Sequence, residues 1–361
     1  MSNDYFYGSS GCTCAVWNSH STHGRGEHTT NMQEHPTRSL SNALLCREYE
    51  EDPAPLKTFL SGSSLGNGGP QLSFIPTAGA PAKASSPPPR IWQVFLEKER
   101  NPKSPGVVTH SSGNHGQAVA YAAKCAGLPC SVVVPKGTPK VKCDAIVNYG
   151  AELVFCEPSP AARKEVCAQI AEATGKAIIH PFDNYNVMAG QGTIALELLE
   201  EVPDLDAILV PISGGGMTSG IAVATHGLNP NCRVFAVEPV GKDLQRSLES
   251  KERLWPNPNR FLDTIADSIR IQQVGDLTFP ILCDYAESKV FSVTDDQMIE
   301  GMRFIFERMK LVVEAASGAA VYAAMNSLED VTPPPRKVGV ILCGGNVDLD
   351  HLPWIDRKTS Y

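Results

Sequence analysis

This sequence of 361 residues lacks the marks of several classes of protein. Its formal net charge of −8 is opposite in sign to the basic stripe that nucleic-acid binding requires. No uninterrupted apolar run approaches the ~20 residues that a helix needs to cross a bilayer, and the N-terminus lacks the charged-then-apolar pattern of a signal peptide. These absences predict a protein that binds neither nucleic acid nor membrane.

Cysteine is present, but not in the pattern of a disulfide framework. The 11 cysteines are spread thinly along the chain and their number is odd. Such usage is typical of reduced thiols in a cytoplasmic protein. The apolar and charged fractions, 42% and 19%, are ordinary for a globular chain with one large domain or two medium ones.

Sustained periodicity is also missing from residues 1–90, which are rich in Ser, Gly, Pro, Asn and His. The stretch 61–90 has too little apolar surface to offset the entropy cost of ordering, so we expect a disordered N-terminal segment. Cys12 and Cys14 lie near several histidines, but the spacing matches no zinc-binding pattern. Composition therefore favours a low-complexity tail over a metal cluster.

Beyond residue 90, short apolar runs alternate with segments of helical spacing. We expect strands over 105–110, 131–135, 151–158, 176–182, 206–212, 232–239 and 338–343. We expect helices over 91–100, 115–127, 138–150, 160–175, 191–203 and 220–227. Strands that alternate with helices of about 10–15 residues indicate parallel sheets covered by helices on both faces. The predicted fold class is therefore α/β.

Polar or glycine-rich loops follow three of these strands, at the sheet edge where ligands bind in open α/β folds. In THSSGNHGQ (109–117), the loop leads into a helix whose first N–H groups lack partners and attract an anionic group. Ser112 and Asn114 add side-chain donors at this point. Helix capping is the structural alternative, although a cap needs only one such residue.

The second loop, PISGGGMTSG (211–220), has three consecutive glycines that let backbone N–H groups bend around a phosphate. It matches neither the nucleotide P-loop nor the dinucleotide fingerprint. The third loop, CGGN (343–346), either admits a flat ligand closely or forms a simple turn. Together the three loops predict a flat, phosphorylated cofactor.

Several motifs, in order along the chain, resemble those of serine racemase and its relatives. They are SSGNHGQAVAYAAK, HPFD with AGQGTIALE, SGGGM, ERMKLVVEAASGAA and LCGGNVDL, and they run from about residue 105 to 350. These relatives are the serine/threonine dehydratases of the fold-type II, tryptophan-synthase-β-like pyridoxal-phosphate enzymes. The resemblance implies pyridoxal 5′-phosphate between two α/β lobes, a serine or threonine substrate, and a homodimer.

The division expected from this resemblance has five parts. The five parts are the N-terminal segment 1–90, a connecting helix at 91–105, a small lobe at 106–183, a large lobe at 184–350 and a tail at 351–361. The active-site cleft should lie between the small lobe and the large lobe.

The resemblance also assigns roles to residues. In this assignment Asn114 hydrogen-bonds the cofactor's ring oxygen, and Cys343 lies beside the pyridine nitrogen. A neutral partner at that nitrogen favours elimination and reprotonation over transamination. Ser111 and His115 fall to the substrate carboxylate, although His115 could equally cap the helix. The phosphate falls to Ser213, Gly214, Gly215, Gly216 and Met217.

Ser112 decides which reaction the resemblance implies. Racemisation requires a proton donor on each face of the cofactor, because removal and return on one face regenerate the same enantiomer. In serine racemase this second serine is the acid/base opposite the catalytic lysine, whereas many bacterial-type threonine dehydratases have alanine there. Ser112 therefore keeps racemisation available beside elimination to pyruvate and ammonia.

A divalent cation such as Mg²⁺ is a further feature implied by the resemblance. Glu238 matches the family's glutamate ligand, and Asp243 could supply a second carboxylate after a shift of one residue. Lys242 and Leu244 fall where the family has a small residue and an aspartate. A lysine so near a cation site is unfavourable.

The Schiff-base lysine of the family is not recognisable. In the family it lies in a Ser-Phe-Lys-x-Arg-Gly-Ala segment upstream of SSGNHG. The upstream lysines here are Lys57, Lys83, Lys98 and Lys103, and none has that context. We therefore expect a poor or inactive catalyst as the chain is written. Either the upstream segment is divergent or wrongly joined, or the chain is a catalytically dead family member that binds the cofactor or a partner.

Overall fold

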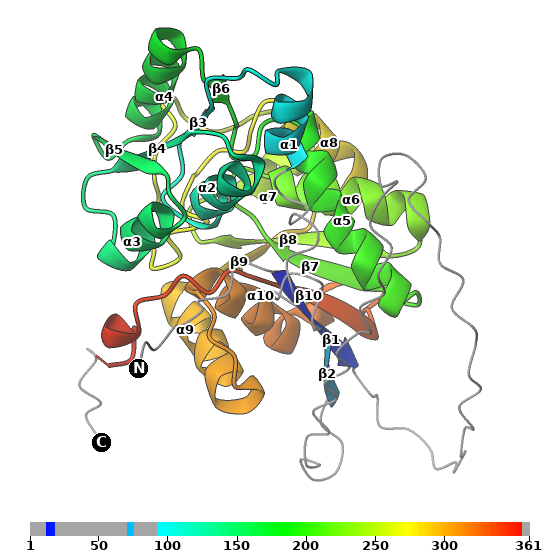
Figure 1. Ribbon diagram of the computed structural model, residues 1–361. Coiled ribbons are helices and arrows are strands. Elements are labelled where there is room, and N and C mark those ends of the chain that lie inside the picture. The colour runs from blue at the N-terminus through cyan, green and yellow to red at the C-terminus, as the bar shows by residue number, and fades with distance from the viewer. Residues whose placement is uncertain (1–11, 19–70, 76–91, 356–361) are drawn as a thin grey trace, which may run out of the picture.

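The computed structural model describes residues 12–18, 71–75 and 92–355 of the chain (Figure 1). Two sheets form separate lobes, each covered by helices. This arrangement confirms the predicted α/β class.

The small-lobe sheet has the strand order β5-β4-β3-β6 and is parallel throughout. β3 and β4 are buried along their whole length, as expected for valine-rich strands covered on both faces. The strands are β3 (Val107–Thr109), β4 (Cys130–Pro135), β5 (Glu152–Cys156) and β6 (Ala177–Ile178). The helices that pack on this sheet are α2 (Asn114–Ala126), α3 (Lys140–Asn148) and α4 (Pro160–Thr174), and α1 (Trp92–Arg100) packs on α2.

The large-lobe sheet has the order β2-β1-β10-β7-β8-β9, and its last four strands are parallel. These four are β7 (Ala207–Pro211), β8 (Arg233–Pro239), β9 (Phe291–Val293) and β10 (Lys337–Cys343). Figure 1 shows helices on both faces of these strands. They are α5 (Tyr185–Glu201) with α6 (Gly216–Leu228), and α9 (Asp295–Phe304) with α10 (Ala315–Asn326).

Two strands lie within residues 1–90, where the sequence predicted a segment without regular structure. β1 (Cys12–Asn18) pairs antiparallel with β10, and β2 (Gln71–Ile75) pairs antiparallel with β1. The partners of β1 and β2 lie far along the chain, so these two strands leave no local signal in the sequence. The rest of that segment, and residues 356–361 of the predicted tail, lie outside the described residues.

Element boundaries differ from the sequence expectation in three places. α5 begins six residues early, because the Oδ1 atom of Asn184 accepts N–H bonds of 2.9 and 3.4 Å from the first turn. α6 begins at Gly216, directly after Gly215 turns the chain with a φ of 95°. The strand expected at 176–182 contains only the two residues of β6.

Several elements between residues 240 and 337 were not predicted at all. They are α7 (Leu244–Ser250), α8 (Thr278–Tyr285), β9, α9, a π-helical turn (Ile305–Met309) and α10. The segment between α7 and α8 has no helix and only one isolated bridge, Phe261 with Ile271. This segment, residues 251–277, crosses to the cleft between the lobes.

Each lobe has its own hydrophobic core. One large cluster of buried side chains joins α5, α6, α9 and α10 to β7, β8 and β10, and a separate cluster joins α2 to β3 and β4. No helix in the described part of the chain has the length and apolar character needed to cross a membrane.

Candidate active site

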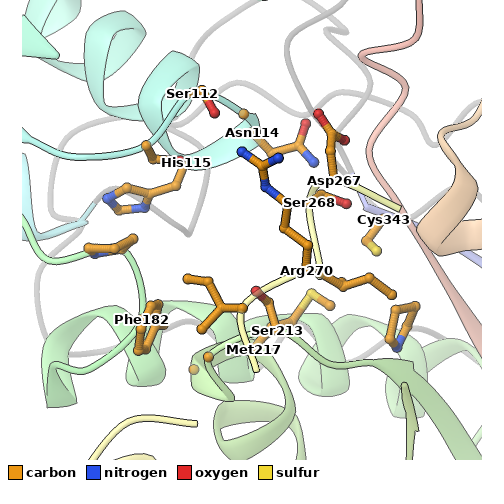
Figure 2. A pocket seen from close by; sticks show the side chains of 18 of the residues that line it. Ser112, Asn114, His115, Phe182, Ser213, Met217, Asp267, Ser268, Arg270 and Cys343 are labelled. Carbon is orange, nitrogen blue, oxygen red and sulfur yellow. The ribbon is translucent and has the colours of Figure 1, made fainter. Parts of the chain in front are cut away.

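A cleft opens where the strand ends of the two lobes face each other (Figure 2). One part of its lining, here called the cofactor wall, is the loop Ser111–His115 together with the glycine cup 213–217. Another part, here called the charged wall, consists of Lys142, Arg163, Asp267 and Arg270. Cys343, at the end of β10, also lines the cleft. Sequence analysis predicted the cofactor wall and Cys343, and the structure brings those residues together.

The three glycines of the cup have no room for a side chain. A Cβ on Gly214 would lie 2.4 Å from the ring of Phe182, and one on Gly216 would lie 2.6 Å from the Phe182 carbonyl oxygen. α6 begins at Gly216, so its first N–H groups have no partner within the helix and carry partial positive charge. The cup therefore fits a phosphate held by backbone groups.

Asn114 is fixed by two residues of the large lobe. Its Nδ2 atom donates to Glu314 Oε1 at 2.5 Å, and its Oδ1 atom accepts a hydrogen bond from Asn346 Nδ2. The Glu314 side chain is buried, with 4% exposed. One Nδ2 hydrogen of Asn114 remains for a ligand, because the amide group has two. Sequence analysis quoted the motif around Glu314 but assigned that residue no role.

Ser112 and Asn114 do not cap α2. The N-cap of this helix is Gly113, and no side-chain hydrogen bond is made there. The capping alternative is therefore wrong for the polar residues of this loop. Ser112 is half-buried on the cleft surface, where Figure 2 shows it beside Asn114 and above His115.

The histidines around the cleft form a ring-contact chain. The rings of His110 and His180 meet edge to face at 5.2 Å, and those of His180 and Phe182 at 5.0 Å. Burial, with smaller contributions from neighbouring groups, lowers the pKa of His110 to about 3, so its ring is neutral. His115 Nε2 lies 3.4 Å from the carbonyl oxygen of Ile179, which holds its ring at the cleft edge.

Cys343 presents a thiol at the floor of the cleft. It is 7% exposed, and its carbonyl oxygen accepts a bond of 3.3 Å from Ser317 Oγ, which anchors the end of β10 to α10. A thiol is neutral and weakly polar, so this position offers no charged partner to a ligand.

Two arginines of the charged wall share one aromatic ring. The guanidinium carbon of Arg163 lies 4.9 Å from the Phe261 ring centroid, and that of Arg270 lies 4.4 Å from it. Burial and the nearby Arg270 charge lower the pKa of Arg163 to about 10. Its Nε atom is buried with no hydrogen-bond partner among the described residues. Figure 2 shows Arg270 reaching into the cleft toward Ser112 and Asn114.

Lys142 and Asp267 join the lobes across the cleft. Lys142, on α3, is 4% exposed and forms an ion pair with Asp267 of the 251–277 segment. Sequence analysis missed all four members of the charged wall. Arg163 and Lys142 lie on helices where charged residues usually face solvent, and the other two lie in a segment without periodicity.

Comparison with known proteins identifies the family to which the chain belongs. A family model described as pyridoxal-phosphate dependent enzyme matches residues 89–344. The chain is 45% identical over 250 residues to serine racemase of Dictyostelium discoideum. The aligned region covers 69% of this chain and 76% of the relative. The chain belongs to the pyridoxal-phosphate-dependent enzyme family, with the serine racemases.

Solved structures of family members superpose on the chain. The crystal structure of the Dictyostelium discoideum serine racemase is 43% identical, with a TM-score of 0.65 over 73% of this chain and 83% of that one. A pyridoxal 5′-phosphate-dependent aspartate racemase is 55% identical, with a TM-score of 0.72 over 74% of this chain and 82% of that one. These matches confirm the resemblance identified from the sequence motifs.

The residues near Glu238 do not fit a divalent cation. Glu238 is buried, and its two carboxylate oxygens accept hydrogen bonds from Ser292 Oγ at 2.9 Å and Leu244 N at 3.2 Å. Asp243 is exposed, and Lys242 lies buried between them in sequence. Among the residues that the structure describes, no group of three or more His, Cys, Asp or Glu side chains could hold a metal ion.

One lysine of the described residues lines the cleft, and it is Lys142. Of the upstream lysines, Lys98 lies on the exposed end of α1 and donates to the carbonyl of Pro102, and Lys103 is also exposed. Lys57 and Lys83 lie outside the described residues.

Proposed function

We propose that this chain binds pyridoxal 5′-phosphate and a small amino acid in the cleft, as a serine racemase or serine/threonine dehydratase-type protein. The observation that carries the proposal is the convergence of the glycine cup, Asn114 and Ser112 on one cleft between two lobes. The cup lies at the start of α6, and Ser112 and Asn114 lie in one motif at the start of α2, so the fold brings two distant motifs together.

The cofactor would lie along the cofactor wall. The cup residues Ser213–Met217 would hold the phosphate through backbone N–H groups, and Asn114 would donate to the ring oxygen. Cys343 would stand beside the ring nitrogen without contributing charge. When bound, the cofactor supplies an electron sink that acidifies the Cα–H of an amino acid.

Ser112 is the proposed proton carrier on the face of the α2 loop. Its Oγ–H can give a proton to, and accept one from, a substrate carbon that lies against this wall. Ser111 and His115 would orient the substrate carboxylate at the same loop. Racemisation also needs a base on the opposite face, which in this family is a lysine.

The base on that opposite face limits the proposed turnover. Lys142, the cleft lysine of the described residues, is already paired with Asp267. We therefore propose weak turnover unless a lysine outside the described residues reaches the cleft. The alternative is a catalytically dead protein that binds the cofactor reversibly.

A second candidate substrate class is favoured by the charged wall. Arg163 and Arg270 place two cations near one ring, and no ion pair joins either of them to a carboxylate among the described residues. The two guanidinium groups repel each other, since the Arg270 charge helps to lower the pKa of Arg163. An anionic substrate group would therefore stabilise both. A dicarboxylic amino acid such as aspartate carries such a group. The 55% identical aspartate racemase supports this candidate.

One spectroscopic experiment separates these possibilities. The purified chain is mixed with pyridoxal 5′-phosphate, and its absorption spectrum is recorded before and after borohydride, followed by peptide mapping. Irreversible labelling of one lysine supports the enzyme, reversible binding supports the catalytically dead protein, and no binding contradicts the proposal.

Product assays then identify the reaction. D-serine and D-aspartate report racemisation, and pyruvate reports elimination from serine. Ser112→Ala should abolish the D-amino acid while pyruvate formation persists. Equal loss of both products would show that Ser112 does not carry the proton to one face.

A further inference from the structure

Lys242 is a fully buried lysine outside the cleft. It is 0% exposed and follows β8 in the turn before α7. Its Nζ atom donates to the backbone carbonyl of Gln272 at 3.0 Å and also to the carbonyl of Ile271. Its own carbonyl accepts a bond from Trp255 Nε1 at 2.5 Å. A buried ammonium group is costly unless such oxygens surround it.

The ligands around Lys242 are those that a metal cation would use. Backbone carbonyls and a carboxylate are the usual oxygen donors to Ca²⁺ and Mg²⁺. Here the two carbonyl oxygens accept hydrogen bonds from Lys242 Nζ. Burial lowers the pKa of Lys242, and the nearby charge of Glu238 acts against that shift. Leu244 is 0% exposed and packs in an apolar cluster, so its side chain supplies no ligand.

A divalent ion would lack ligands at this place. Ca²⁺ takes about 6–8 oxygen ligands, and Mg²⁺ requires near-octahedral coordination. Both oxygens of Glu238 already accept hydrogen bonds, and the exposed Asp243 is held in the left-handed region with a φ of 56°. A divalent ion beside a fixed ammonium group would also be repelled.

We propose that the Lys242 ammonium group takes the place of the divalent cation, so that this chain carries a built-in monovalent cation at the end of β8. The charge is supplied by the sequence and cannot be removed by a chelator. The site therefore does not respond to the concentration of divalent ions.

The built-in cation positions the wall of the cleft. Ile271, whose carbonyl binds Lys242, lines the cleft directly after Arg270. A second tie acts on the same segment, because Gln272 Nε2 donates to the carbonyl of Gly241 at 3.1 Å. Lys242 thus fastens the Arg270 segment to the end of β8, which makes it a positioning residue.

The first test uses the unaltered protein and needs no activity. Isothermal titration calorimetry with MnCl₂, MgCl₂ and CaCl₂ should give no saturable heat, and the thermal midpoint should shift by less than about 1 °C with either 5 mM metal or EDTA. Saturable binding of any of the three ions, with a raised midpoint, overturns the proposal.

The second test moves the cation from the protein to the solution. Lys242→Ala combined with Leu244→Asp removes the ammonium and adds a carboxylate beside Glu238. The thermal midpoint should fall by about 10 °C without metal and recover by several degrees with MnCl₂. A double variant whose midpoint ignores MnCl₂ counts against a shared cation site.

Two single variants complete the design. Lys242→Met keeps the side-chain length without charge, so it should lose stability and should not respond to metal. Lys124→Met, at an exposed position on α2, is the matched control and should leave the midpoint unchanged. If Lys242→Met is as stable as the control, the charge is not needed and the proposal fails; if no Lys242 variant folds, the titration of the unaltered protein decides.

Discussion

The two walls of the cleft are built on different physical terms. The cofactor wall uses glycines, helix N–H groups and short neutral side chains, with Asn114 held between Glu314 and Asn346. The charged wall uses long cationic side chains that share an aromatic ring or cross between lobes. The cofactor wall depends on glycines that leave space for a ligand, and the charged wall depends on the positions of its charged side chains. We infer that the cofactor wall sets which cofactor binds, and the charged wall sets which amino acid is accepted.

The largest expected effect comes from filling the cup. Gly216→Ala places a Cβ 2.6 Å from the Phe182 carbonyl oxygen, a backbone atom that cannot easily move. We expect a loss of about 3 kcal/mol or more in the free energy of unfolding, and no cofactor binding. Urea denaturation and absorbance titration measure both. Gly227→Ala, in the same helix with no atom within 4 Å, should instead stabilise the protein slightly.

The next effect tests whether Asn114 is a bridge. Asn114→Ala removes the donor to the buried Glu314 carboxylate and the acceptor for Asn346. We expect a loss of about 2 kcal/mol in stability and about 10-fold weaker cofactor binding, because a buried carboxylate loses a hydrogen bond. Asn148→Ala, exposed at the end of α3, is the control. Equal stability of the two variants would show that the hydrogen bonds of Asn114 do not stabilise the cofactor wall.

A smaller effect is expected from the charged wall. Arg270→Gln removes one cation and should weaken L-aspartate binding about 10-fold, because a charge-assisted hydrogen bond is lost. Binding of L-asparagine, the neutral analogue of the same shape, should change little. Competition calorimetry with both ligands checks this, with the exposed Arg246→Gln as control. An equal loss for both amino acids would contradict a role in charge selection.

The last prediction concerns the pH dependence of stability. Burial holds the pKa of His110 at about 3, against 6.5 for the free side chain, so the unfolded chain binds a proton that the folded chain does not. The resulting stability is complete above about pH 6.5 and falls by about 1 kcal/mol per unit as the pH falls toward 3. His110→Gln should flatten that dependence between pH 6.5 and 5. If the thermal midpoints of the unaltered protein and of His110→Gln depend on pH in the same way, the His110 imidazole is not buried in a neutral form.

The same contrast explains what could be predicted from the sequence. β3, β4, β7 and β8 were predicted because runs such as those at 131–135 and 206–212 are short, mostly apolar segments that contain Val or Ile. The cofactor wall was predicted because glycine and short polar residues at strand ends are locally distinctive.

The charged wall, Glu314 and the elements between 240 and 337 were not predicted. Arg270 acquires a role only because the 251–277 segment brings it and Phe261 beside Arg163 of the small lobe, and local spacing does not encode such a path. Lys242 is the intermediate case. Its conflict with a metal site was visible in the sequence, but its bonds to Ile271 and Gln272 were not.

Phe182 belongs to the chain segment that joins the lobes, yet its ring and carbonyl also form the back of the glycine cup. The next residue, Asp183, accepts N–H bonds of 2.9 to 3.3 Å from residues 276–278 at the start of α8. One short segment therefore both joins the lobes and forms part of the glycine cup. We infer that a ligand seated in the cup would resist rotation of one lobe on the other.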